Sequence, residues 1–210
     1  MALADSTHSN AAPFRLGLLN GSDRPTGNAV GLLSWLTPIL ESSLAPLDLV
    51  QLNPYTSVLG PIDAPECPFT VEDPTSYARL ETRAWSEVVR SCDAIFILTP
   101  QHNYGYPASI KLAIDHLGRE WSGKAIVLLG YGGRGDGKGV QQLREVLGGA
   151  LRAKLVGNLG EIKFPMDLVS GSSRLGSQGK VIGAEGGGVP LWLSGWESKV
   201  EVALRELRGQ

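Results

Sequence analysis

One glycine-rich stretch, LLGYGGRGDGKGVQQL at residues 128–143, has the residue types of a nucleotide-binding loop. Residues 130–135 satisfy the dinucleotide pattern G-x-G-x-x-G, and residues 132–139 satisfy the P-loop pattern except at its last position. A P-loop needs Ser or Thr there to bind Mg²⁺, and this chain has Gly139; the dinucleotide pattern belongs after the first strand of its unit, not the fourth. We therefore reject both motifs and interpret residues 132–135 as backbone that passes close to a flat ligand.

A second stretch, NGSDRPTGN, joins the first apolar run to the first helical segment. It offers hydroxyl and amide donors, a positive charge and glycines that let backbone N–H groups approach an anion. These residues are Gly21, Ser22, Arg24, Thr26, Gly27 and Asn28. With the helix N-terminus behind them, they predict a cradle for a monophosphate. The alternative is an N-cap turn that binds no ligand.

A third stretch, TPQHNYGYP, places three rings in a short turn after the most apolar run: His102, Tyr104 and Tyr106. Such rings, with exposed backbone N–H groups, can line a flat heteroaromatic ligand, or they can simply pack on the protein. No Ser-His-Asp or Cys-His set accompanies His102. Asp115 and His116 are consecutive on a predicted helix, so they face different ways.

The elements that position these loops alternate along the chain. Strands are expected at 14–20, 47–53, 94–100, 124–130 and within 154–164, and helices at 28–41, 75–91, 107–117, 140–151 and 195–207. This alternation predicts an α/β fold: a flavodoxin-like, doubly wound, five-stranded parallel sheet of order 2-1-3-4-5 with helices on both faces. In such a sheet, loops 21–28, 100–106 and 131–139 meet at the carboxyl ends of the strands, where ligands bind.

Several local features carry their own expectations. Pro38 should kink or shorten the first helix. Five prolines in residues 54–74 should exclude regular structure, and the Gly- and Ser-rich residues 170–190 should form a loop. The apolar faces of two helices are expected at three- and four-residue spacing. They comprise Tyr77, Leu80, Ala84, Val88 and Cys92 in one helix, and Trp196, Val200, Ala203 and Leu207 in the other.

Composition limits the class of protein. A chain of 210 residues with net charge -2 suits one domain, expected at 13–210 after a disordered lead at 1–12, and it argues against a nucleic-acid partner. No secretory signal or membrane-spanning stretch is present, and Cys67 and Cys92 have no metal-ligand spacing. We expect a cytoplasmic location, because two lone thiols suit a reducing compartment.

The third stretch with its continuation, TPQHNYGYP followed by ASIKLAID, resembles the NADPH-dependent FMN reductase family. That family carries T-P-E-Y-N-x-x-x-P followed by L-K-N-A-I-D-x-L, opens with G-S-x-R after its first strand, and has a glycine-rich loop after its fourth. Gly21–Arg24 and Gly132–Gly139 match the latter two. Gln101 and His102 stand where the family usually has Glu and Tyr. The resemblance covers about residues 14–155, and residues 165–193 match no motif.

The resemblance implies bound FMN, with NADPH or NADH as a transient hydride donor and a quinone, azo compound or flavin as the small-molecule acceptor. It implies a homodimer or homotetramer. His102 and Tyr104 are weak candidates for proton delivery. The implied cofactor-binding residues lie in all three loops. They are Gly21, Ser22, Arg24, Thr26, Gly27, Asn28, Pro100, Gln101, His102, Asn103, Tyr104, Gly105, Tyr131, Gly132, Gly133 and Arg134.

Three alternatives stay open on the same scaffold. A flavodoxin-type electron carrier would share the fold without reducing a substrate of its own, although such carriers are usually strongly acidic. A flavoprotein reductase of a specialised biosynthetic pathway would carry the same motifs. A ligand-free interaction protein is also compatible with the fold alone.

Overall fold

Five parallel strands form the centre of the molecule. The computed structural model describes residues 12–53, 59–135, 137–170, 175 and 190–209. Its sheet has the order β2-β1-β3-β4-β5, and every adjacent pair is parallel. The strands are β1 (Phe14–Asn20), β2 (Leu47–Leu52), β3 (Ala94–Pro100), β4 (Ala125–Gly132) and β5 (Lys154–Lys163). The predicted flavodoxin-like topology is confirmed. The predicted lead at 1–12 lies outside the described residues except for Ala12.

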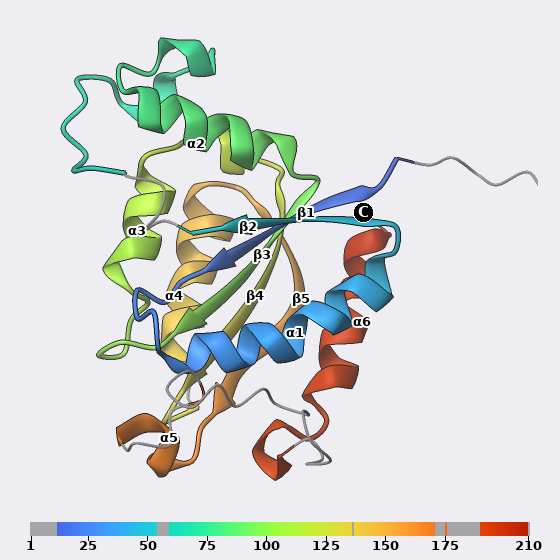
Figure 1. Ribbon diagram of the computed structural model, residues 1–210. Helices are drawn as coiled ribbons and strands as arrows, with labels where there is room; N and C mark the ends of the chain where they lie inside the picture. The colour runs from blue at the N-terminus through green and yellow to red at the C-terminus, as the bar shows by residue number, and fades with distance from the viewer. Residues whose placement is uncertain (1–11, 54–58, 136, 171–174, 176–189, 210) are drawn as a thin grey trace, which may run out of the picture.

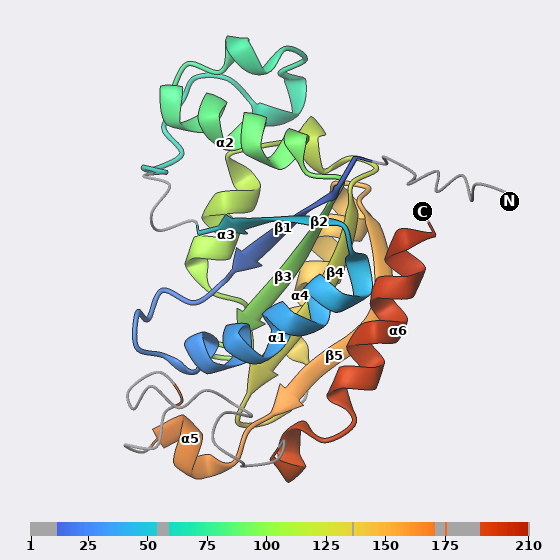
Figure 2. The ribbon, with the colours of Figure 1, turned by 45° about the vertical axis from the view of Figure 1, so that its right-hand side comes forward.

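Helices cover both faces of this sheet (Figures 1 and 2). One face carries α1 (Asn28–Leu44) and α6 (Trp196–Arg208), and the other carries α2 (Leu80–Ser91), α3 (Ala108–Asp115) and α4 (Lys138–Arg144). Side chains of β3 alternate between the two layers: Phe96 and Leu98 pack under α1 and α6, whereas Ile95 and Ile97 pack on the other side. All of β3 is buried, as its uninterrupted apolar run predicts.

The first and last helices lie side by side. Val200, Ala203, Leu204 and Leu207 of α6 are buried in the core layer shared with α1, and Trp196 packs against its edge. Arg208 donates hydrogen bonds to the carbonyl oxygens of Ser43 and Ala45, just where α1 ends. The predicted inner face of α6 is therefore correct. The predicted end of α1 is three residues too early, because the helix continues through Pro38 to Leu44.

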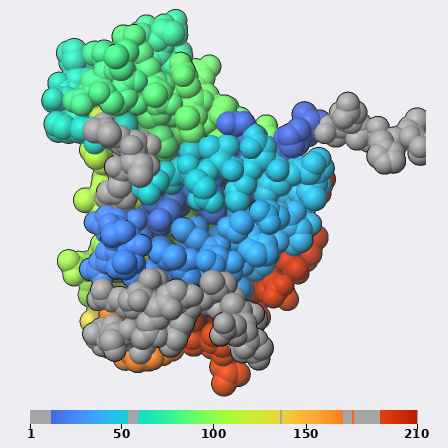
Figure 3. Space-filling model, viewed as in Figure 1, coloured from blue at the N-terminus to red at the C-terminus, as the bar shows by residue number. Residues whose placement is uncertain are grey.

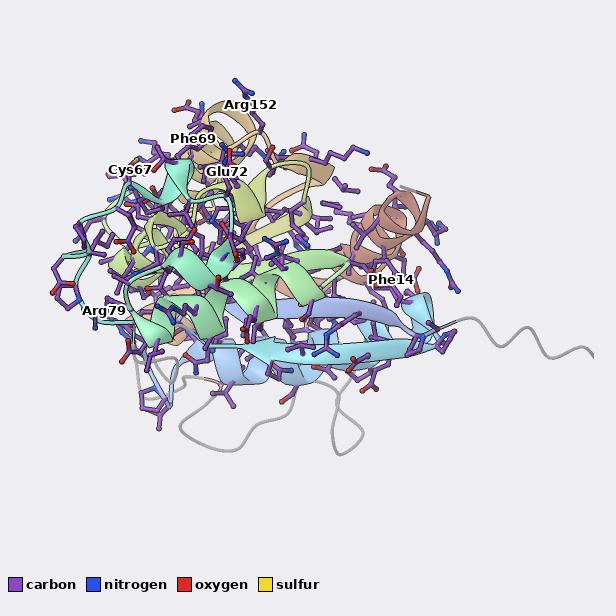
Figure 4. All side chains as sticks on the ribbon, turned by 90° about the horizontal axis from the view of Figure 1, so that it is seen from above. Phe14, Cys67, Phe69, Glu72, Arg79 and Arg152 are labelled. Atoms are coloured by element: carbon purple, nitrogen blue, oxygen red, sulfur yellow. The ribbon has the colours of Figure 1, made fainter. Side chains whose placement is uncertain are left out.

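Residues 59–79 form an excursion between β2 and α2. Figure 3 shows this teal and green part of the chain as a lobe at one end of the molecule, and in Figure 4 the labelled Cys67, Phe69 and Glu72 lie on it together, far from Phe14. The prolines do not exclude all regular structure: 3-10 turns form at Pro68–Thr70 and Pro74–Ser76, each with proline in its first turn. Residues 54–58 of the predicted loop lie outside the described residues.

The predicted apolar face of α2 is correct only in part: Tyr77 and Cys92 are buried and Val88 packs against the core, but Leu80 and Ala84 are exposed. The helix begins at Leu80, not near Thr75, and Leu80 itself is 71% exposed. The buried side is instead Thr82, Trp85, Ser86 and Val89. Two of these residues are polar because they pair with buried groups of the neighbouring segment, so apolar periodicity could not identify this face.

Those partners are Glu120 and His116. The Glu120 carboxylate, 8% exposed, accepts hydrogen bonds from Ser86 Oγ at 2.7 Å, Tyr77 Oη at 3.1 Å and Gly118 N at 3.1 Å. Burial raises the pKa of the Tyr77 hydroxyl, and the neighbouring Glu120 charge raises it further, so Tyr77 stays protonated as a donor. This network attaches the end of the excursion to the segment before β4.

His116 attaches the start of the excursion. Its Nε2 donates to the Gly60 carbonyl at 2.8 Å, and in that tautomer Nδ1 accepts from Thr82 Oγ1 at 3.1 Å. Asp115, the preceding residue, points elsewhere and pairs with Lys111. The expectation that these two neighbours face different ways is confirmed.

Three further elements differ in detail from the sequence-based expectation. Helix α3 begins at Ala108 and ends at Asp115, inside the expected range. The expected helix at 140–151 is α4 followed by a π-helical turn at Glu145–Ala150. The expected loop at 170–190 is preceded by a short helix, α5 (Met166–Ser170), and most of its residues lie outside those described.

We expect Ser86→Ala to lower the free energy of unfolding by about 1.5–3 kcal/mol, because it leaves the buried Glu120 carboxylate with one donor fewer. Urea denaturation of the apoprotein measures this. The matched control is Ser42→Ala on α1, where an exposed hydroxyl bonds only its own helix; its change should stay within about 0.5 kcal/mol. Equal effects of the two substitutions would contradict the proposed importance of the Glu120 network.

Candidate functional site

A cavity opens at the carboxyl ends of the strands, where the three polar loops meet. It encloses about 530 Å³ of empty space, a figure that includes space open to solvent. Its walls come from four segments that are far apart in sequence. The residues that line the cavity are Ser22, Arg24, Gly27, Asn28, Pro100, Gln101, His102, Tyr131, Gly132, Gly133, Phe164 and Val169.

The loop after β1 forms one end of this cavity. Ser22 N donates to Asn20 Oδ1 at 3.0 Å, and Ser22 Oγ accepts from Arg24 N at 3.3 Å, so the hydroxyl keeps its own proton for an anion. Gly27 is the N-cap of α1 and provides no side-chain cap, and the amides of the first helical turn have no acceptor inside the helix. These donors and the Arg24 charge form an anion cradle.

Tight packing explains the glycines of this loop. A Cβ on Gly27 would lie 3.0 Å from Arg24 Cβ, and one on Gly21 would lie 2.8 Å from Thr99 Oγ1. Gly21 therefore allows the loop to pack on β3 and does not line the cavity. Thr26 is exposed and also lies outside the cavity lining.

Asn28 lines the cavity, but its side chain faces a protein partner. Its Nδ2 donates to the Leu168 carbonyl at 2.8 Å, and its Oδ1 accepts from Leu175 N at 2.9 Å. Both polar ends of the amide are thus engaged by one segment that follows β5. The expected donation of this amide to a phosphate is not what the structure shows.

The loop after β3 is a tight hairpin. His102 and Gly105 exchange both backbone hydrogen bonds at 2.8 Å, and the two residues at the tip, Asn103 and Tyr104, adopt left-handed backbone with φ of 49° and 68°. That conformation is unfavourable for a residue with a large side chain, so the surrounding contacts must hold it. Neither tip residue belongs to the cavity lining, which includes His102.

The start of α4 provides those contacts. Gln101 Oε1 accepts from Gly139 N at 3.1 Å, and Gln142 Nε2 donates to the Tyr104 carbonyl at 3.3 Å. A Cβ on Gly139 would lie 3.0 Å from the Gly105 carbonyl oxygen. The position at which the P-loop pattern fails is thus the position at which the hairpin backbone packs.

Two cations lie over the ring of Tyr104. Lys138 Nζ is 3.8 Å and Arg134 Cζ is 4.7 Å from the ring centroid, distances typical of cation–π contact. Arg134 therefore joins the glycine loop to the hairpin and is not part of the cavity lining.

His102 is the titratable ring inside the cavity. Partial burial lowers its pKa, and the positive charge of Arg24 lowers the pKa further, while Asp23 opposes the shift. The imidazole is therefore neutral at neutral pH in the free protein. Because the Arg24 charge lowers this pKa, we expect the hairpin and the anion cradle to act on one another electrostatically.

The glycine loop after β4 forms the floor. A Cβ on Gly132 would lie 2.7 Å from Glu161 Oε1, and one on Gly133 would lie 2.9 Å from Val169 Cγ2. The Glu161 carboxylate accepts from Gly135 N at 3.1 Å and fixes the loop from below. These glycines allow close packing on the protein side as well as on the cavity side.

Sequence reasoning missed the wall that follows β5. Phe164 and Val169 line the cavity, and the Phe164 ring packs on Tyr131 at 5.3 Å and on Trp192 at 5.1 Å between centroids. The signal was available: β5 ends at the same edge of the sheet as β1, β3 and β4, so the apolar residues after it belong to the same site.

Ten of the predicted cofactor-binding residues line the cavity, and six do not. The six have packing or surface positions beside it: Gly21, Thr26, Asn103, Tyr104, Gly105 and Arg134. Within the described ranges no cluster of three or more His, Cys, Asp or Glu side chains could hold a metal ion. None of the helices in those ranges is long and apolar enough to cross a membrane.

Comparison with known proteins provides independent evidence about the family of this chain. A family model described as NADPH-dependent FMN reductase matches residues 14–162. The NAD(P)H-dependent FMN reductase LOT6 of Saccharomyces cerevisiae is 34% identical over 168 residues, which is 74% of this chain and 87% of that protein. A Schizosaccharomyces pombe protein named NAD(P)H-dependent FMN reductase C4B3.06c is 37% identical over 93 residues, which is 44% of this chain and 46% of that protein.

Solved structures share the fold at low identity. The flavoenzyme NAD(P)H:(acceptor) oxidoreductase FerB of Paracoccus denitrificans superposes with a TM-score of 0.58 at 18% identity, covering 93% of this chain and 97% of that one. An azoreductase of Bacillus anthracis gives a TM-score of 0.54 at 15% identity, covering 91% and 99%. These similarities show the flavodoxin-like fold.

We expect Gly139→Ser, which completes the P-loop pattern, to bring no affinity for ATP–Mg²⁺. It should instead lower the free energy of unfolding by about 1–3 kcal/mol, because the new Cβ overpacks the hairpin backbone. Calorimetric titration with ATP–Mg²⁺ and urea denaturation measure the two effects. Gly149→Ser is the control, since a Cβ there meets nothing within 4 Å.

We expect Arg24→Gln to raise the pKa of His102, since it removes the second cause of the lowered value; the pKa should remain below that of an exposed histidine because burial persists. An NMR titration of the His102 ring measures both variants. Arg90→Gln, an exposed change on α2, should leave that pKa where it is. An unchanged pKa in Arg24→Gln would mean that the two loops do not interact.

Proposed function

Because this chain belongs to the NADPH-dependent FMN reductase family, we propose that it transfers a hydride from a nicotinamide donor through bound FMN to a small acceptor molecule. FMN is the flavin of the family and NAD(P)H its electron donor. We also propose that the acceptor is of the quinone, azo or flavin type and that the donor is NADPH or NADH. The observation that carries the proposal is the convergence of the anion cradle and the glycine floor on one cavity.

The residues of the cavity fit FMN. One end has a charge, hydroxyl and helix N-terminus for a monophosphate, from Ser22, Arg24 and the Gly27–α1 turn. The other end has backbone without side chains at Gly132 and Gly133, beside the rings of Tyr131 and Phe164. A flat ring system with a phosphate tail needs this combination of a polar end and a narrow apolar end.

When bound, FMN supplies the hydride chemistry, and the chain supplies binding, orientation and electrostatics. Arg24 and Ser22 would hold the phosphate, and the Gly132–Gly133 backbone would let the ring system approach the floor closely. The neutral His102 lines the cavity, where it could orient a ligand by accepting or donating one hydrogen bond. If an acceptor needs a proton from a side chain, His102 lines the cavity, whereas Tyr104 lies outside it.

We further propose that residues 13–210 act as one FMN-binding unit, that the protein is cytoplasmic, and that it forms a homodimer or homotetramer. The family resemblance supports the assembly, and the two lone thiols support the compartment. The exposed hairpin tip with its two cations offers a surface beside the cavity through which a second subunit or a charged substrate can reach it.

An electron carrier with the same fold is the second candidate. The observation that favours it is that His102 of the cavity lining has a lowered pKa and is neutral at neutral pH, and electron transfer alone would need no proton donor. The purified protein distinguishes the two. Flavin absorption near about 450 nm that NADPH or NADH bleaches supports the reductase. Bound flavin that neither donor bleaches supports the carrier, and absence of flavin binding even after FMN is added contradicts both.

We expect Arg24→Ala to weaken FMN binding by at least about tenfold, because the phosphate loses a charge-assisted hydrogen bond. Titration of the apoprotein with FMN, followed by quenching of flavin fluorescence, measures the dissociation constant. Arg90→Ala, which changes the same residue type on the outer side of α2, should leave it within about twofold. Unaltered affinity in Arg24→Ala would show that another group holds the phosphate.

A further inference from the structure

Residues that follow β5 line the cavity and also form hydrogen bonds with the first residue of α1. We call residues 164–169 together with Leu175 the outer wall. Figures 1 and 2 both place α5, which belongs to it, beyond the carboxyl ends of β4 and β5. Phe164 and Val169 of the outer wall face the cavity, while Leu168 and Leu175 are buried in the core layer below α1.

One side chain clamps the outer wall to α1. The amide of Asn28 donates to the Leu168 carbonyl at 2.8 Å and accepts from Leu175 N at 2.9 Å. Both bonds connect residues about 140 positions apart in sequence, so no local structure replaces them if the amide is lost. Only an Asn side chain combines a donor and an acceptor at this length.

Two glycines let the outer wall approach closely. A Cβ on Gly31 of α1 would lie 2.5 Å from Leu175 Cβ, and one on Gly133 of the floor would lie 2.9 Å from Val169 Cγ2. Contacts below about 3 Å cannot persist without movement. These two close contacts therefore fix the position of the outer wall relative to α1 and to the floor of the cavity.

The outer wall also lies beyond the residues that the family model matches. The family model matches residues 14–162, and both cavity-facing residues of the outer wall, Phe164 and Val169, come after that match. The cradle, the hairpin and the floor lie inside it. Phe164 and Val169 thus complete the cavity from residues beyond the family match.

We infer that Val169 is a specificity-determining residue that limits the size of the electron acceptor, and that Asn28 is a positioning residue that keeps Val169 in place. The inference rests on the proposed function, since it names which acceptors that same site admits. Val169 is half-buried, branched and apolar, so it restricts space without offering a hydrogen bond. It should therefore discriminate between flat apolar acceptors by the number of fused rings and not by their polar groups.

The first experiment varies the size of residue 169. With saturating donor, kcat/KM is measured for a one-ring benzoquinone and a three-ring anthraquinone. Val169→Ala should raise the ratio of the three-ring to the one-ring value by at least about fivefold, and Val169→Phe should lower it by a similar factor. The dissociation constant of FMN is measured by fluorescence quenching for each variant, and the acceptor ratio is determined at saturating FMN. Val202→Ala, an exposed position on α6, is the control and should not change the ratio.

The second experiment tests the clamp without turnover. In the apoprotein, Asn28→Ala should speed hydrogen exchange of the Leu175 amide by roughly tenfold, because the acceptor for that amide is gone. The same variant should shift the ratio of the two acceptors in the direction of Val169→Ala. If Asn28 only stabilised the fold, its loss would lower kcat/KM for both acceptors together and leave their ratio unchanged. Asn158→Ala, exposed on β5, is the matched control.

The outcomes separate the two levels of the proposal. Suppose that the donor bleaches the flavin but the acceptor ratio is identical in the wild type and both Val169 variants. This result overturns the inference and leaves the proposed function intact. Absence of bleaching in the wild type overturns the proposed function, and the role of Val169 in acceptor choice falls with it. If Asn28→Ala does not fold, the pair of Val169 variants still decides the specificity role.

Discussion

The contact on which the candidate site depends is the packing of the hairpin backbone on the start of α4. Gly139 has no side chain, so the Gly105 carbonyl can approach it, and Gln101 then accepts from its amide. This contact holds two left-handed residues at the hairpin tip in a conformation that they would not adopt alone. It joins the loops after β3 and β4 into one rigid unit, against which the cradle after β1 and the outer wall after β5 close.

The resulting cavity has two chemical ends. Arg24, Ser22 and the N-terminus of α1 make one end cationic and rich in donors, while Tyr131, Phe164 and Val169 make the other apolar. His102 lies in the lining as a neutral ring, since burial and Arg24 both lower its pKa. The polarity therefore changes along the cavity, and this gradient orients an amphipathic ligand before any specific contact is made.

The sequence predicted most of the fold and the location of the site. The buried run of β3 and the spacing of the loops were sufficient, because parallel strands have one carboxyl edge. The sequence-based prediction failed where contacts with distant segments determine which side chains are buried and which groups they bind. Ser86 and Thr82 are polar but buried, because Glu120 and His116 lie opposite, and no pattern within α2 encodes that. The sequence predicts that Asn28 donates to an anion, whereas its side-chain amide forms hydrogen bonds with the backbone of Leu168 and Leu175. Phe164 and Val169 were within reach, since they follow a strand of the same sheet.

The pairing of α1 with α6 has a consequence for biosynthesis. Leu32, Leu36 and Leu40 of α1 are buried in the layer to which α6 contributes Val200, Ala203 and Leu204. A ribosome makes α1 more than a hundred and fifty residues before α6, at about 5–20 residues per second. During those seconds the part of this apolar layer that α6 covers in the folded protein stays exposed on the nascent chain. The chain should therefore bind chaperones while it is being translated, and release should follow emergence of α6.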